Sequence, residues 1–165
     1  MMCSQHMWRR VKSWSQPIKP RQRPAAARLG DWAATTFTEN GDDLVIAMEV
    51  QTYLTVVFPF GERAVFDGGF SRALSGALED LGVMPDASAI ELSAAPPVCR
   101  YRIHDPRIRE ALDFAEFTCA VERGYGHDLR TAQRHLNDLP HNLPPDYVAA
   151  KAVRRLFRTD AAGRN

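Results

Sequence analysis

Histidines are the first residues to consider for chemistry in this sequence of 165 residues. Only two of the five share one predicted helical neighbourhood, because His127 and His135 are eight positions apart. Eight helical residues rise by about 12 Å, which is too far for both side chains to bind one metal ion. No His-Glu-x-x-His pattern and no Cys/His pair at ligand spacing is present. We therefore predict neither a metal site nor a cofactor, and the other histidines are His6, His104 and His141.

Carboxylates and nucleophiles do not form a recognisable catalytic pattern either. Glu110 and Asp113 are three residues apart on a predicted helix that also carries Arg107 and Arg109. This spacing favours a solvated face with ion pairs over a catalytic pair. No serine lies in a Gly-x-Ser-x-Gly motif, and Gly68-Gly69 is expected to form a turn because no phosphate-binding motif surrounds it. We predict no catalytic residue.

One interpretation that the sequence leaves open is an enzyme of unrecognised type. It would require a concave pocket with convergent polar groups. The candidate lining residues of such a pocket are Asp31, Trp32 and Arg107.

Three cysteines bear on the cellular compartment. Cys3, Cys99 and Cys119 form no Cys-x-x-Cys pair, and their number is odd. The first residues include Arg9 and Arg10 but no apolar stretch of the secretory type. We therefore expect three free thiols in the reducing cytoplasm. No apolar run approaches the ~20 residues of a membrane span, so we expect no membrane association.

A balanced net charge of +1 hides an asymmetry along the chain. Residues 1–30 carry seven basic and no acidic side chains, whereas residues 31–165 carry 14 basic and 20 acidic ones. Two tryptophans, Trp8 and Trp14, lie among the N-terminal cations, as in proteins that bind single-stranded nucleic acid. The alternative to an anionic partner is that the basic residues 1–30 pack against the acidic remainder of the same chain. The candidate residues for an anionic partner are Arg9, Arg10, Lys12, Lys151, Arg154, Arg155 and Arg158.

The elements that must position these residues follow from the hydrophobic periodicity. Strands are expected over 32–38, 44–50, 53–60 and 98–103, with a hairpin turn at Asn40-Gly41-Asp42. Helices are expected over 3–14, 71–81, 86–92 and 105–123, then around Leu129–Leu139, and finally from Pro144 to Phe157. The helix over 105–123 is expected to be the most buried, because Phe114, Phe117 and Val121 widen its apolar stripe.

The predicted fold class is α+β, with a small, mostly antiparallel sheet of about four strands, the meander first, packed against four to five helices. Residues 1–29 are interpreted as a basic N-terminal helix and a proline-rich connector. Residues 30–158 form a single domain in this interpretation, and residues 159–165 form a frayed tail.

Several short segments follow one another in a characteristic order: Cys3 to Val11, Leu29-Gly30-Asp31-Trp32, Leu81-Gly82-Val83, Leu136-Asn137-Asp138-Leu139-Pro140 and Pro144 to Phe157. This order resembles a bacterial family of about this length that is known only as a domain of unknown function. The central family motif, Arg-Ser-Val-Leu-Gly-Ser-Met-Asn, is altered here, with Glu110 in place of the glycine and Asp113 in place of the asparagine. The resemblance implies an architecture and no activity.

From these observations we expect a cytoplasmic, non-enzymatic binding module whose partner is a protein. A nucleic-acid-binding protein that uses the basic N- and C-terminal residues is the main alternative. The two differ in salt dependence, because binding to phosphates weakens steeply with salt.

Overall fold

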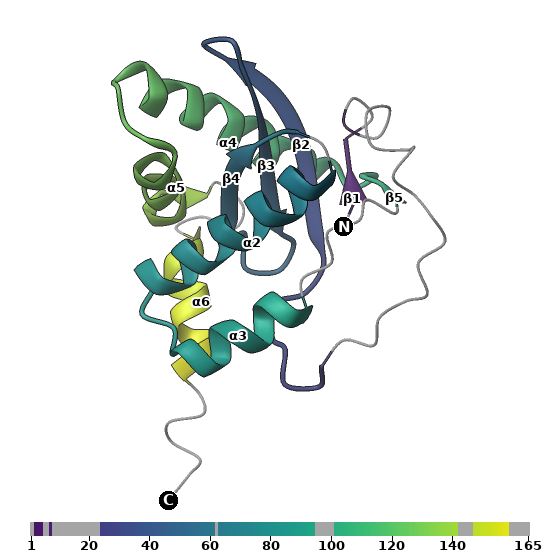
Figure 1. Ribbon diagram of the computed structural model, residues 1–165, viewed down its shortest axis with the longest axis vertical. Coiled ribbons are helices and arrows are strands. Elements are labelled where there is room, and N and C mark those ends of the chain that lie inside the picture. Colours follow the sequence, from purple (N-terminus) through teal and green to yellow (C-terminus); the bar gives the residue numbers. More distant parts are fainter. Residues whose placement is uncertain are drawn as a thin grey trace, which may run out of the picture.

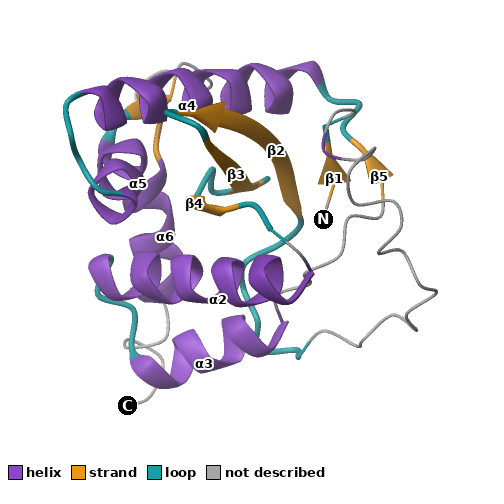
Figure 2. Cartoon of the chain, turned by 45° about the horizontal axis from the view of Figure 1, so that its top comes forward, coloured by secondary structure: helices purple, strands orange, loops and turns teal. Residues whose placement is uncertain are grey.

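In the computed structural model, the described residues are 2–4, 7, 24–61, 63–94, 101–141 and 147–158. They form three layers, with a mixed sheet between two groups of helices (Figure 1). Helices α2, α3 and α6 cover one face of the sheet, and α4 covers the other, while α5 lies at the β4 edge (Figure 2). The predicted α+β class is confirmed.

Three antiparallel strands make up most of the sheet: β2 (Trp32–Glu39), β3 (Asp42–Glu49) and β4 (Thr55–Pro59). The predicted turn between β2 and β3 is confirmed, since Asn40 and Gly41 have φ values of 51° and 85°. Positive φ at both positions is typical of the tight hairpin turn that Asn-Gly favours. Two-residue strands β1 (Met2–Cys3) and β5 (Tyr101–Arg102) extend the sheet in the order β4-β3-β2-β1-β5.

Both faces of the central strands are buried, because alternating side chains of one strand enter two different cores. Trp32 and Phe58 lie in the core beneath α2, where each ring packs edge-on against Phe70. Ile46 and Met48 point to the opposite core, beneath α4. Strands buried on both sides explain the continuous apolar runs in this part of the sequence.

Helix α2 (Arg63–Asp80) begins eight residues before the predicted start, so the expected turn at Gly68-Gly69 is wrong. Both glycines are helical, and Gly69 lies directly against the ring of Phe58. A Cβ atom at position 69 would be 2.9 Å from Phe58 Cδ2, closer than real Cβ atoms approach. The close contact between helix and sheet therefore requires a glycine and outweighs its low helix propensity.

The remaining helices are α3 (Pro85–Ala94), α4 (Pro106–Gly124), α5 (Leu129–Asp138) and α6 (Ala149–Arg158). The last helix does not start at Pro144, because Tyr147–Val148 form strand β7, which pairs with β6 (Pro140–His141). The expected helix over 3–14 is wrong at its start, since Cys3 lies in β1. Residues 8–14 and 159–165 lie outside the described residues. Among the described residues, no helix combines the length and apolar character needed to cross a membrane.

Side-chain amides of α5 replace a neighbouring strand along the outer edge of β4. Asn137 accepts a hydrogen bond from the backbone N–H of Thr55 and donates one to its carbonyl, both at 2.8 Å. Gln133 accepts from the backbone N–H of Val57 at 2.9 Å and donates to the carbonyl of Ala73 in α2 at 3.1 Å. Three backbone polar groups of this edge strand are thereby paired, which protects it from pairing with another chain.

A buried thiol in α4 leads to a first prediction. Cys119 is fully buried, and burial raises its pKa to about 11. The thiolate is the reactive form of cysteine, so we expect Cys119 to resist iodoacetamide at about pH 8 in the folded chain. Mass spectrometry of the peptide that contains Cys119 measures this directly, with the urea-unfolded chain as the fully reactive control. Equal labelling of folded and unfolded chains would contradict the buried placement.

Candidate interaction surface

Helix α4 is fixed at its start by local sequence. Asp105 is the N-cap, and its Oδ1 accepts a hydrogen bond from the backbone N–H of Arg107 at 2.9 Å, while Pro106 follows at the first helical position. The backbone bond and the Arg107 guanidinium hold the pKa of Asp105 below its usual value. One side of the helix enters the core through Ile108, Ala111, Leu112, Ala115 and Cys119.

The opposite side of α4, with the turn after it, carries four large apolar side chains, of which the sequence predicted Phe114, Phe117 and Val121 to be buried. Phe117 and Tyr125 are 68% and 78% exposed, and Phe114 and Val121 are 36% and 39% exposed. Their spacing of three, four and four residues places them in one stripe along the helix and into the turn after it. The expectation that Phe114, Phe117 and Val121 widen the buried stripe of α4 is wrong, because a helix lying on a sheet can bury only the side that faces it.

Acidic side chains accompany this stripe. Glu110 and Asp113 are exposed, Glu116 is partly buried, and the three recur at intervals of three residues beside the apolar positions. The pKa of Glu116 is raised, first by burial and then by the negative charge of Asp113. Within the described ranges, no cation forms an ion pair with Glu110 or Asp113, and the neighbouring Arg107 pairs with Asp105. We call this surface, with Phe114, Phe117, Val121 and Tyr125, the α4 outer face.

The residues proposed from sequence for an enzyme pocket have separate roles. Trp32 is a core residue against Phe70, whereas Asp31 and Arg107 are exposed. The backbone N–H of Val50 donates a hydrogen bond to the carbonyl of Asp31 at 2.9 Å, which joins the residue before β2 to the residue after β3. The two cavities described below have other lining residues.

The basic residues proposed for an anionic partner fall into two groups. Lys151, Arg155 and Arg158 are exposed on α6, and Arg154 is partly buried beside a cavity of about 70 Å³ that Asp80 and Asp138 also line. The opposite side of α6 packs into the core. The other group, Arg9, Arg10 and Lys12, lies outside the described residues.

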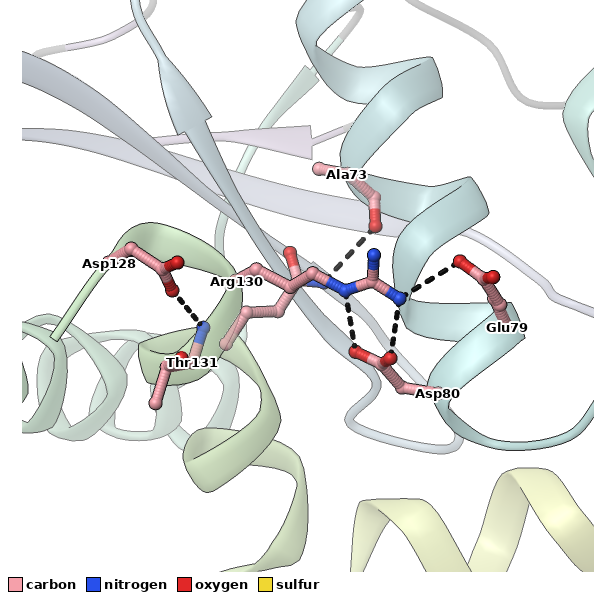
Figure 3. Close-up of polar contacts among 7 residues, drawn as sticks. Ala73, Glu79, Asp80, Asp128, Arg130 and Thr131 are labelled. Carbon is pink, nitrogen blue, oxygen red and sulfur yellow. Dashed lines mark hydrogen bonds and ion pairs between the residues drawn. The ribbon is translucent and has the colours of Figure 1, made fainter.

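A shallow groove of about 230 Å³ lies between β4, α2 and α5, with Arg72 and Arg130 at its wall. Arg130 is occupied, since it donates to Asp80 at 2.7 and 3.3 Å and to Glu79 at 2.9 Å (Figure 3). This cluster joins the end of α2 to the start of α5. Arg130 therefore joins the ends of the two helices, and its guanidinium is already engaged in these ion pairs.

The sequence did not indicate a role for two glutamates, Glu49 and Glu91, which are buried in the structure. Both bind the backbone at the start of the Leu29-Gly30-Asp31-Trp32 motif. Glu49 accepts a hydrogen bond from the backbone N–H of Gly30 at 2.8 Å, and Glu91 accepts from those of Arg28 and Leu29 at 2.5 and 3.1 Å. A Cβ atom at Gly30 would lie 2.7 Å from Glu49 Oε1, so this position needs a glycine. The motif that begins Leu29-Gly30 therefore has a structural role, with the two carboxylates binding its backbone.

A second cluster that the sequence analysis did not find lies where α4 meets α5. The imidazole rings of His127 and His135 are 5.2 Å apart between centroids, and the Nδ1 atoms lie 2.6 and 2.7 Å from Glu122 Oε2. The expected separation of about 12 Å assumed one continuous helix. That assumption is wrong, because His127 lies in the turn before α5, whose helix begins at Leu129.

Comparison with known proteins adds a family assignment. A family model described as "Domain of unknown function (DUF6933)" matches residues 1–153. No curated protein sequence matches the chain significantly.

Proposed function

The chain belongs to the DUF6933 family of unknown function, and we propose that it is a binding module for another protein. The exposed apolar stripe on α4 is the observation that carries this proposal. Contiguous apolar side chains on a surface commonly mark an interaction site. Aromatic residues also contribute most of the binding energy in protein interfaces, and three of the four apolar residues here are aromatic.

The acidic row beside the stripe indicates the chemistry of the partner. Glu110 and Asp113 have no ion-pair partner within the described ranges, and repulsion between Asp113 and Glu116 contributes to the raised pKa of Glu116. A cationic side chain placed there would relieve this repulsion. We therefore propose a partner segment with apolar residues along one side and lysine or arginine along its border, docked on the α4 outer face.

Site-specific crosslinking in the native cells tests this proposal. A photoreactive phenylalanine analogue replaces Phe117 in one variant and Met84 in the control, because Met84 is 72% exposed and lies outside α4. We expect Phe117 but not Met84 to crosslink to one protein, through a peptide that carries both apolar and basic residues. Phe117→Glu should then weaken binding of that synthetic peptide by at least about 30-fold, which corresponds to a hot-spot loss of ~2 kcal/mol. Met84→Glu should leave it unchanged.

Three outcomes would overturn the proposal. Crosslinks to many proteins at both positions would show that Phe117 makes only nonspecific contacts. Crosslinks only between copies of this chain would assign the α4 outer face to self-association. Nucleic acid that copurifies at low salt, and is lost on Arg154→Glu without any crosslink at Phe117, would favour the nucleic-acid alternative.

A further inference from the structure

We propose that Glu122, His127 and His135 bind one zinc ion at the junction of α4 and α5. One ligand atom from each side chain lies within 4.8 Å of the other two. Two imidazole nitrogens and one carboxylate oxygen form a common ligand set for zinc in proteins, where water completes the four-coordinate shell. This site is separate from the α4 outer face and does not depend on the proposed protein partner.

The distances fit an ion after a small movement of the side chains. Tetrahedral bonds of 2.0–2.1 Å place neighbouring ligand atoms about 3.3 Å apart. The two Nδ1 atoms now lie 2.6 and 2.7 Å from Glu122 Oε2, as hydrogen-bonded groups do. Opening each of these distances by about 0.7 Å would admit the ion, and side-chain rotations of this size need no backbone change.

Hydrogen bonds to the backbone already hold two of the three ligands, Glu122 and His127, next to each other. The turn between the helices passes through Gly126 with a φ of 86°, and the backbone N–H of His127 donates to the Glu122 carbonyl at 3.2 Å. Arg123 Nη1 donates to the carbonyl of His127 at 3.0 Å. Such preorganisation reduces the entropy lost when the ion binds.

The surroundings allow an ion to enter and do not oppose its charge strongly. The side chains of His127 and His135 are 41% and 38% exposed, and that of Glu122 is 17% exposed. Two cations are adjacent to proposed ligands in the sequence: Arg123 has Asp42 as a counter-charge at 4.0 Å, and Arg134 is exposed to solvent. Asp128 has a different task as the N-cap of α5, where it accepts from the backbone N–H of Thr131 at 2.7 Å.

Calorimetric titration of the full chain with zinc chloride tests the site. The chain carries no affinity tag and is stripped of metal with a chelator beforehand. We expect one equivalent to bind, and we expect His127→Ala and His135→Ala each to weaken binding by at least about 100-fold, because each removes one of three ligands. His104→Ala removes an exposed histidine outside the cluster and should leave the affinity unchanged.

Cobalt and thermal unfolding separate this site from other sources of zinc binding. Cobalt bound by nitrogen and oxygen should give visible bands without thiolate charge transfer, whereas binding by a cysteine would produce it and overturn the proposal. Zinc at about 100 times its Kd should raise the Tm of the wild-type chain by about 5–10 °C. Each alanine variant should fold without metal and lose this shift. An absence of zinc binding, or zinc binding that survives both histidine substitutions, would also overturn it.

Discussion

Replacing Glu49 with alanine should lower the free energy of unfolding by about 3–5 kcal/mol, since several donors inside the protein lose their acceptor. The Glu49 carboxylate is fully buried. Its Oε1 accepts from the N–H of Gly30. Its Oε2 accepts from the N–H groups of Gln51 and Thr52, at 3.0 and 2.6 Å, and from the Thr52 hydroxyl at 2.7 Å. This one side chain therefore holds the β3–β4 turn and the entry to β2 together.

Glu49→Gln distinguishes the role of the carboxylate from that of its size. Glutamine keeps the volume but offers only one acceptor oxygen, so it cannot serve Gly30 and the β3–β4 turn together. We expect it to cost about 2 kcal/mol. Glu110→Ala removes an exposed glutamate and is expected to change stability by less than about 0.5 kcal/mol. Urea unfolding followed by circular dichroism measures all three, and a Glu49→Ala chain as stable as the wild type would refute the assigned role.

Asn137→Ala is expected to have the second-largest effect, a loss of about 2–4 kcal/mol. Asn137 is buried and pairs with both the N–H and the carbonyl of Thr55, and its amide also donates to the Gln133 carbonyl at 2.9 Å. Alanine leaves a buried donor and a buried acceptor of β4 without partners, and each unpaired group costs about 1–3 kcal/mol. The released edge should also favour association between chains, because unpaired strand edges add to one another.

The isosteric change Asn137→Asp gives a sharper version of this test. Aspartate can still accept from the N–H of Thr55, but its second oxygen would face the carbonyl oxygens of Thr55 and Gln133 where the amide donated. We expect a loss comparable to that of alanine at neutral pH, with partial recovery in acid as the carboxyl group becomes protonated. Asp138→Ala, at an exposed neighbouring position, serves as the control. Urea midpoints and size-exclusion chromatography report the two effects, and an unchanged midpoint for Asn137→Asp would show that the amide is not needed.

Elements with local signals were predictable from the sequence. Asn40-Gly41 has the backbone preferences of a tight turn, and Asp105-Pro106 begins α4 through a cap made by its own neighbours. The apolar and β-branched residues of β2, β3 and β4 predict these strands. In each case the interactions that select the structure lie within a few residues of one another, so the α+β architecture follows from the sequence.

Features that join distant segments were decided only by the tertiary structure. Gly69 lies within α2, although its residue type favours a turn, because the ring of Phe58 packs where any larger residue would place its Cβ atom. Phe117 is exposed because the sheet covers one side of α4, although its residue type predicts burial. His127 and His135 meet on Glu122 because the chain turns at Gly126, a geometry that sequence separation does not reveal. Periodicity thus determined which elements form, whereas packing between them determined which side chains are buried, exposed or brought together.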